Sequence, residues 1–385
     1  MFRSYIKTAL RFLRKNRTFS VINLAGLALG TLCCLYIVLY VKDQYSYDRG
    51  FDHAADIYRV TTSMELVGDR HRMATASPPI APAMKSDFPQ VLQFTRFIPT
   101  LGADEHLLVY KEKSFYEKEA YLVDSTFFDV FNFHFSSGSS DHVLSAPNSI
   151  VLSRPVADRL FADESPIGKT ITMNDAWGKN IFTVTGVVDE SLGKSSIHAN
   201  MFIRMNPHGF GGSLLENNTW TGNNFAWSYV KLAPGASPEA LEKQLPAFLD
   251  KHGQQQLEED GMTKVLRLQP IASIHTSAGY DAETGHTVSS SFLNILILIA
   301  LLIQVIACIN FMNLSTARAS GRAKEVGIRK VVGAGRNSLV VQFLAESCSA
   351  RAGGGDDRRA DAGICVSLSE PDHAGGYVPV HARGL

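Results

Sequence analysis

Two uncharged stretches decide the fold of this chain. Residues 19–41 read FSVINLAGLALGTLCCLYIVLYV, and residues 292–313 read FLNILILIALLIQVIACINFMN. As a helix, each stretch of about 22 residues is roughly 33 Å long, which is enough to cross the hydrocarbon core of a bilayer. Gln304 is the main polar residue inside the second stretch. The sequence therefore predicts two transmembrane helices, over residues 19–41 and 291–313.

Basic residues lie on one side of each predicted span. The first span is preceded, without any acidic residue between them, by Arg3, Lys7, Arg11, Arg14, Lys15 and Arg17. The second span is followed, with Glu325 as the one acidic residue, by Arg318, Arg322, Lys324, Arg329, Lys330 and Arg336. Lys and Arg close to span ends mark the cytoplasmic side. We therefore expect an inner-membrane protein with both termini in the cytoplasm and residues 42–290 outside.

The first 18 residues have a helical pattern of their own. Phe2, Ile6, Leu10 and Leu13 fall on one face, beside the basic residues. This pattern is typical of a helix that lies in the membrane interface, and a disordered basic leader is the alternative. A cleaved signal peptide would need a shorter apolar stretch, of about 7–15 residues, and a small-residue cleavage site. We therefore expect the first span to be a permanent signal anchor.

The segment between the spans reads as a mixed α+β domain with two lobes. Phe182–Val188 and Trp227–Leu232 have the β-branched and aromatic enrichment of strands. Pro238–Leu249 is predicted as a helix capped by Ser237, and Val156–Phe161 as a second short helix. All five cysteines lie outside this segment, so the domain must fold without disulfides.

No catalytic or metal-binding pattern stands out in this domain. Gly168-Lys169-Thr170 resembles the end of a phosphate-binding loop, but Asp163 stands where that loop requires glycine. The histidines lack metal-ligand spacing, and His198 and His275 are expected to be surface or satisfied core residues. The chain holds 37 basic and 37 acidic residues, which argues against a nucleic-acid partner. We expect no cofactor, and a binding or mechanical module rather than an enzyme.

Four stretches resemble one known family, and residues 229–245, YVKLAPGASPEALEKQL, are one of them. Residues 308–347, CINFMNLSTARASGRAKEVGIRKVVGAGRNSLVVQFLAES, closely resemble the region after the second span of MacB/FtsX-type ABC transporter permeases. Residues 12–60, which include the first span, look like the start of the same proteins. Residues 147–173, PNSIVLSRPVADRLFADESPIGKTITM, resemble their periplasmic core domain. The resemblance covers residues 1 to about 346.

The resemblance implies a permease subunit with four spans, of which this chain shows two. Such a permease pairs with an ABC ATPase, forms a dimer with a second permease copy and works in membrane lipid, in export or in lipoprotein or peptide handling. No nucleotide-binding motif occurs here, so the ATPase must be a separate subunit. The resemblance places an ATPase-coupling region in residues 314–346, at Arg322, Lys324, Glu325, Val326, Gly327, Ile328, Arg329, Lys330, Gly333 and Ala334. Gly26 and Gly30 form a G-x-x-x-G motif that lets helices approach closely in the first span.

The chain departs from this family in residues 347–385. That stretch is rich in Ala, Gly, Arg and Asp and contains no run long enough for a third span. Our hypothesis is that a frameshift replaced the rest of the membrane domain, and a natural soluble tail is the alternative. A two-span receptor with an external sensory domain, or a membrane-anchored scaffold, is the competing functional interpretation.

Overall fold

The computed structural model describes residues 17–66, 69–100, 105–175, 178–189, 194–207 and 211–321, together with residues 327, 328 and 331. The described residues within 28–309 form one compact unit, and the described residues outside that range belong to a second. Most of the predicted interfacial helix, the whole predicted tail and most of the predicted coupling region lie outside the described residues.

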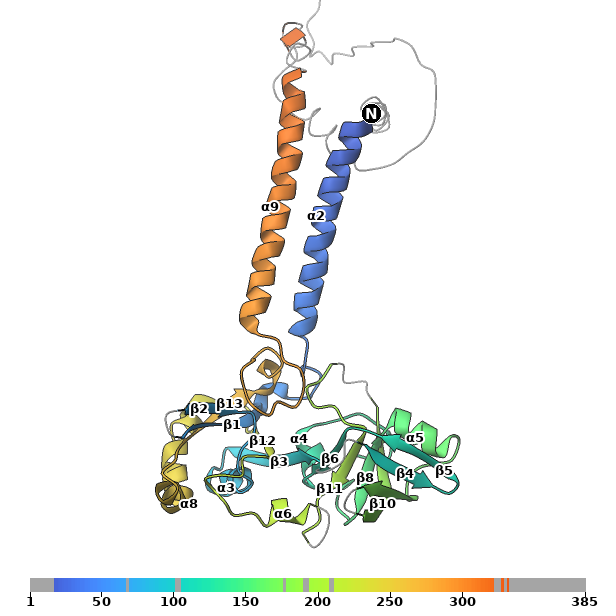
Figure 1. The fold of residues 1–385 in the computed structure, drawn as a ribbon, viewed down its shortest axis with the longest axis vertical. Coiled ribbons are helices and arrows are strands. Elements are labelled where there is room, and N and C mark those ends of the chain that lie inside the picture. Colours follow the sequence, from blue (N-terminus) through green and yellow to red (C-terminus); the bar gives the residue numbers. More distant parts are fainter. Residues whose placement is uncertain are drawn as a thin grey trace, which may run out of the picture. The chain divides into compact units, whose positions relative to one another are not determined.

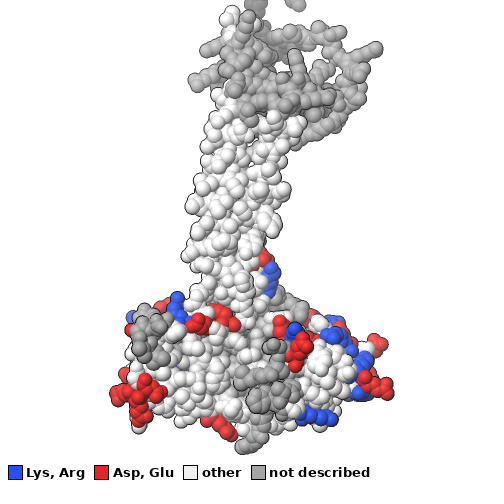
Figure 2. Space-filling view, viewed as in Figure 1, with Lys and Arg blue, Asp and Glu red and all other residues white. Residues whose placement is uncertain are grey.

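Both predicted spans are long helices. Helix α2 covers Arg17–Gln44 and helix α9 covers Ser290–Gly321. Their apolar windows have mean hydropathies of 2.2 and 2.9, and most of each window is exposed. Leu29 and Leu301, for example, are 63% and 59% exposed. Figure 2 shows the described surface of these helices almost free of charged side chains. Apolar side chains on an exposed helix surface fit a membrane span and do not fit the core helix of a soluble protein.

The two helices lie side by side and touch through small or apolar residues (Figure 1). A Cβ atom added to Gly30 of α2 would lie 2.8 Å from the Cβ atom of Ala307 of α9. Nearer the external domain, Val41, Val288 and Leu293 form a small buried cluster. The backbones can approach closely at Gly30 because neither residue there has a bulky side chain.

Among the described residues, 13 strands join in one mixed sheet between the spans. Its main path runs in the order β13-β1-β12-β3-β6-β11-β8-β10-β9-β4-β5, with β2 paired to β1 and β7 to β10. The pairs β6–β11 and β8–β10 are parallel and the others are antiparallel. The strands are β1 (Ile57–Leu66), β2 (Asp69–Met73), β3 (Val91–Pro99), β4 (His106–Tyr110), β5 (Lys113–Glu117), β6 (Ala120–Val123), β7 (Phe135–Ser137), β8 (Ser149–Ser153), β9 (Thr170–Asp175), β10 (Gly178–Val188), β11 (Met201–Arg204), β12 (Trp227–Leu232) and β13 (Thr263–Pro270).

Short helices pack on the sheet at its two ends and at its centre (Figure 1). They are η1 (Ala54–Asp56), α3 (Ile80–Asp87), α4 (Phe127–Val130), α5 (Arg154–Phe161), α6 (Gly212–Leu215), α7 (Pro238–Glu242), α8 (Leu245–Glu259) and η2 (Ile271–Ser273). Each end of the sheet has its own hydrophobic core, one with α5 and the other with α3, α7 and α8. An aromatic cluster around Phe97 and Phe127 fills the centre. The predicted α+β domain is confirmed, and its two lobes are the two ends of one sheet.

The strand predictions at Phe182–Val188 and Trp227–Leu232 are confirmed by β10 and β12, and α5 contains the predicted helix Val156–Phe161. The long helix predicted over Pro238–Leu249 is wrong as a single element.

Helix α7 ends at Glu242, and α8 begins at Leu245. Pro246 explains the break, because its ring would clash with the carbonyl of Glu242, four residues earlier, in a continuous helix. The predicted cap is present, since the Ser237 hydroxyl accepts a hydrogen bond from the Ala240 amide at 3.1 Å.

Candidate functional site at the span–domain junction

The outer end of α2 is tied to the external domain through one histidine. The Nε2 atom of His275 lies 2.7 Å from the Oε1 atom of Gln44, the last residue of α2. The His275 ring also stacks on Tyr47, with 3.6 Å between ring centroids and 4° between the planes. His275 is 4% exposed. A stacked, hydrogen-bonded and buried ring holds the end of the span in one position relative to the domain.

A buried carboxylate forms a second tie just beyond α2. Asp48 accepts hydrogen bonds from the Ser195 hydroxyl at 2.8 Å and from both the amide and the hydroxyl of Ser196 at 2.6 Å. Lys194, in the same segment, forms an ion pair of 2.6 Å with Asp43 of α2. Burial raises the pKa of Asp48, and the hydrogen bonds from Ser196 and Ser195 oppose that rise.

The segment before α9 is fixed to the sheet by a buried ion pair. The guanidinium group of Arg59, on β1, binds both carboxylate oxygens of Glu283, at 2.6 and 3.0 Å. The Arg59 side chain is fully buried, and Gln269 accepts two further hydrogen bonds from it. Two-pronged contacts of this kind fix orientation as well as position. Glu283 thus anchors the segment seven residues before α9 begins.

Backbone hydrogen bonds continue this anchoring into α9. The Trp227 indole donates to the Ala282 carbonyl at 2.8 Å. The Val288 amide donates to the carbonyl of His275 at 2.8 Å, and the amide of Ser290, the first residue of α9, donates to Thr276 at 3.0 Å. His275 therefore contacts the end of α2 with its ring and the start of α9 with its backbone. The ends of both spans and the sheet form one connected unit.

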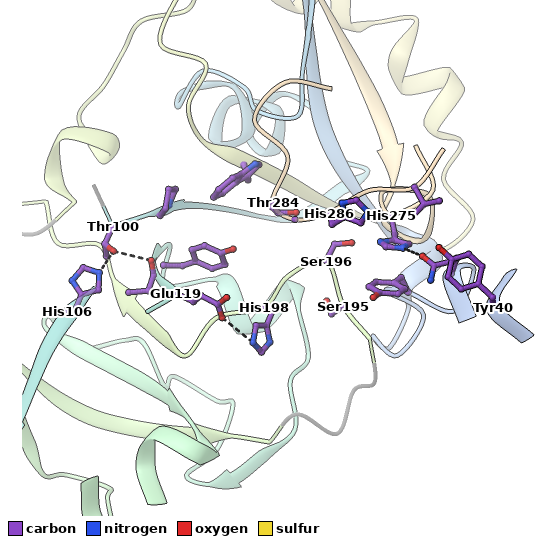
Figure 3. A pocket seen from close by; sticks show the side chains of 18 residues that line it. Tyr40, Thr100, His106, Glu119, Ser195, Ser196, His198, His275, Thr284 and His286 are labelled. Carbon is purple, nitrogen blue, oxygen red and sulfur yellow. Dashed lines mark hydrogen bonds and ion pairs between the residues drawn. The ribbon is translucent and has the colours of Figure 1, made fainter. Parts of the chain in front are cut away.

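A cavity of about 760 Å³ lies beside this junction (Figure 3). It is lined by Tyr40, Gln44, Tyr47, Pro99, Thr100, His106, Glu119, Ala120, Tyr121, Ser195, Ser196, His198, Trp227, His275, Thr284, Gly285, His286 and Val288. These residues come from the end of α2, from the sheet and from the segments that anchor both spans. The volume lies within the range of about 300–1,000 Å³ that is usual for small-molecule sites.

Polar contacts order much of the lining. The Thr100 hydroxyl and the Nε2 atom of His106 are 2.6 Å apart, and Nε2 of His198 lies 3.2 Å from Glu119. Burial lowers the pKa of His275, and the neighbouring His286 lowers it further. His275 therefore stays neutral to a lower pH than an ordinary histidine.

The residues singled out from the sequence take different places. Gly30 faces α9 at Ala307, while a Cβ added to Gly26 would lie 3.5 Å from Asn310. Gly327 and Ile328 are helical and exposed. The predicted coupling residues that lie outside the described part of the chain are Arg322, Lys324, Glu325, Val326, Arg329, Lys330, Gly333 and Ala334.

The phosphate-loop resemblance has no structural counterpart. Gly168 and Lys169 form a turn, and Thr170 begins strand β9 rather than a helix. A phosphate-binding loop needs the amino end of a helix at that position. Within the described ranges, no group of three or more His, Cys, Asp or Glu side chains is placed to hold a metal ion.

Sequence reasoning missed the junction residues Asp48, Arg59 and Glu283, and it treated His275 as an ordinary satisfied histidine. That expectation is confirmed, because His275 is buried and hydrogen-bonded. Its partner Gln44 is 231 residues away, so no local pattern joins them. The sequence did offer one signal, which is the position of polar residues close to the outer ends of the two spans. The external domain must contact its spans at these places.

Comparison with known proteins places the chain in a family. A family model described as the MacB-like periplasmic core domain matches residues 20–248, which is more than half of the chain. The macrolide export ATP-binding/permease protein MacB of Aggregatibacter actinomycetemcomitans is 26% identical over 252 residues, covering 63% of this chain and 34% of that protein. The uncharacterized ABC transporter permease YvrN of Bacillus subtilis is 23% identical over 360 residues, covering 89% of this chain and 82% of that protein.

A solved domain from Porphyromonas gingivalis is 25% identical, with a TM-score of 0.48, and the match covers 57% of this chain and 91% of that domain. The chain spans about a third of the length of the curated MacB relatives that it matches.

The family and the named relatives support the permease interpretation and do not favour the receptor or scaffold alternative. Two apolar helices flanking such a domain indicate an inner-membrane protein with a large extracytoplasmic region. The chain belongs to the family defined by the MacB-like periplasmic core domain.

Proposed function

We propose that this chain is the permease subunit of a MacB/FtsX-type ABC transporter, which couples a separate ATPase to its extracytoplasmic domain. The proposal rests on the contacts of His275 at the junction between the spans and the external domain. Because His275 holds the end of α2 through its ring and the start of α9 through its backbone, a movement of the spans is passed to the sheet. Export or lipoprotein and peptide handling would use that movement, with ATP hydrolysis left to the partner.

The proposed orientation puts both termini in the cytoplasm, because basic residues flank the cytoplasmic ends of both spans. A second permease copy and surrounding lipid are the other proposed partners. The exposed faces of α2 and α9 are apolar, which suits contact with lipid or with further spans.

The ATPase would dock on the region of residues 314–346. Two described residues of that region support this part of the proposal: Ile328 is 60% exposed and Val331 is 89% exposed. Apolar side chains left open on a helical segment mark a surface that a partner covers. The charged residues of this region, Glu325 among them, would pair with opposite charges on the ATPase.

Binding of the ATPase to the purified full chain tests this proposal. Glu325→Lys and Gly327→Pro should each weaken binding at least about tenfold, because one reverses a charge and the other breaks the helix. Two variants are matched controls. Glu112→Lys makes the same charge change on an exposed turn of the external domain, and Gly327→Ala adds a Cβ atom where no other atom lies within 4 Å. Unchanged binding in both test variants would contradict the coupling role.

The genomic neighbourhood separates the proposal from the receptor alternative. An adjacent gene for an ABC ATPase is expected under the permease proposal, whereas a neighbouring kinase or response regulator would favour a receptor.

A further inference from the structure

The cavity beside the junction joins the membrane surface to the interior of the external domain. Tyr40 belongs to the apolar window of α2, and it lines the same cavity as Tyr121 and Trp227 from the sheet. Trp227 and Tyr121 are each 8% exposed and pack against one another at 5.8 Å between ring centroids. A molecule that leaves the outer membrane leaflet next to α2 would meet an aromatic wall at this place.

Histidine dominates the polar part of the lining. His106 comes from β4, His198 from the segment before β11, and His275 and His286 from the connection between β13 and α9, and all four line one cavity (Figure 3). Glu119 is the one carboxylate among the described lining residues, and no lysine, arginine or aspartate joins it. Glu119 already lies 3.2 Å from His198. The lining therefore has little net charge while its histidines are neutral and becomes positive when they gain protons.

From this arrangement we infer that the cavity is a binding site for an amphiphile with an anionic head group, which it takes up more tightly in acid than in neutral solution. The aromatic wall would hold the apolar part of the molecule. His198 and His286 would face the anion, since both are exposed, whereas His106 and His275 are buried and held by Thr100 and Gln44.

The charges around the two exposed histidines favour an anion only when both rings are protonated. The other titratable lining groups are Tyr40, Tyr47, His106, Glu119, Tyr121 and His275. Just outside the lining, Lys194 pairs with Asp43 at 2.6 Å. Asp48 is buried under three hydrogen bonds from Ser195 and Ser196. Protonated His198 neutralises Glu119, which leaves the charge of His286 for the ligand.

Occupancy of this cavity would bear on the junction itself. The lining includes Gln44 and His275, which tie α2 to the domain, and Val288, which leads into α9. A ligand there would contact the end of α2 and the segment that leads into α9. The inference does not require the ATPase, so its failure would leave the coupling proposal standing.

Binding of a fluorescent anionic amphiphile tests the inference directly. The probe is anilinonaphthalene sulfonate, whose sulfonate keeps its charge across the pH range, and the protein is the full chain in phosphatidylcholine nanodiscs with empty nanodiscs subtracted. Energy transfer from tryptophan to the probe reports binding. We expect the dissociation constant to be at least about fivefold lower at about pH 5.5 than at about pH 7.5.

Three controls locate the site and keep the outcome decisive. Trp227→Phe should lower the energy transfer, because that indole lines the cavity, while Trp177 and Trp220 remain as donors. Phenylnaphthylamine, which lacks the sulfonate, should bind equally at both pH values and should still bind the variant His198→Gln/His286→Gln, which shows that its cavity is intact. The sulfonate probe should bind that variant no more tightly in acid than in neutral solution. It should still bind His53→Gln/His71→Gln, which changes two exposed histidines elsewhere, more tightly in acid.

An equal affinity of the sulfonate probe at the two pH values in the wild-type chain would overturn the inference. Energy transfer that is unchanged in Trp227→Phe, or tighter binding of the sulfonate probe in acid that persists in His198→Gln/His286→Gln, would also overturn it.

Discussion

The ring of His275 lies flat on the ring of Tyr47, with 3.6 Å between the centroids and 4° between the planes. The same histidine bonds to Gln44 with its ring and accepts a hydrogen bond from Val288 with its carbonyl. One residue therefore contacts the end of the first span and the lead into the second. Under the proposed coupling, this residue would carry a movement of the two helices to the domain.

The buried carboxylate of Asp48 should be essential to the first anchor. Asp48→Ala leaves the Ser195 hydroxyl and the amide and hydroxyl of Ser196 without their acceptor, which should lower the free energy of unfolding of the external domain by about 2–4 kcal/mol. Asp48→Asn should cost much less, because its carbonyl still accepts hydrogen bonds and asparagine tolerates the left-handed backbone at this position, where φ is 58°. Chemical denaturation of the two variants measures the difference, and equal losses would contradict the role of the carboxylate as acceptor.

The Arg59–Glu283 pair should be far more important than an exposed ion pair. Glu283→Ala leaves the guanidinium of Arg59, which is fully buried, without its carboxylate, and should cost about 3–5 kcal/mol of unfolding free energy. Glu164→Ala is the matched control, since both side chains of its pair with Lys111 are about half exposed, and its loss of stability should be much smaller than that of Glu283→Ala. Similar losses in the two variants, measured by denaturant titration, would argue against a fixed anchor before α9.

The two glycines of the first span should respond differently to alanine. Gly30→Ala places a Cβ atom 2.8 Å from that of Ala307, so α2 and α9 must move apart, at a cost of about 1–3 kcal/mol. Gly26→Ala meets Asn310 at 3.5 Å, an ordinary contact, and should be neutral or slightly stabilising because alanine favours the helix. Thermal unfolding in detergent compares them, and an unchanged midpoint in Gly30→Ala would exclude close packing at that point.

Lys264 should give the external domain a stability that rises with pH. Its ammonium group is buried against Ser77 Oγ and the Trp220 carbonyl, each at 2.6 Å, and burial lowers its pKa from 10.5 to about 7. Between these two values the unfolded chain binds a proton that the folded chain does not. The free energy of unfolding should therefore increase with pH, by up to about 1.4 kcal/mol per pH unit.

Lys264→Met removes the titrating group, so its stability should rise less steeply with pH than that of the wild type above about pH 7. Denaturant titrations of both proteins at a series of pH values provide the comparison. Parallel curves for the two proteins would rule out Lys264 as the source of the dependence.

Much of the fold could be predicted because its main signals are local. Uncharged runs of span length define α2 and α9, and β-branched residues between turn residues define β10 and β12. Pro246 in the sequence already indicated the break between α7 and α8. The regular spacing of leucines nevertheless led to the prediction of one continuous helix. In the structure the proline decides, because its ring excludes a continuous helix.

The junction could not be predicted, because its contacts join residues that are far apart in the chain. Arg59 and Glu283 are separated by 224 residues, and Asp48 and Ser196 by 148. Such pairs follow from the order of strands in the sheet, which periodicity does not specify. The coupling region rests on resemblance, and its role stays a prediction, as does the frameshift after Glu346.

The most direct test of the account follows the external domain while the ATPase works. A spin label replaces Lys179, an exposed residue of β10, in each copy of a permease dimer reconstituted with its ATPase, and electron–electron distances are measured with and without ATP. The wild type and His53→Ala, which changes an exposed histidine, should show a shift in distance on ATP binding. His275→Ala should still hydrolyse ATP but show no shift. A shift of wild-type size in His275→Ala would contradict the claim that this junction transmits the movement.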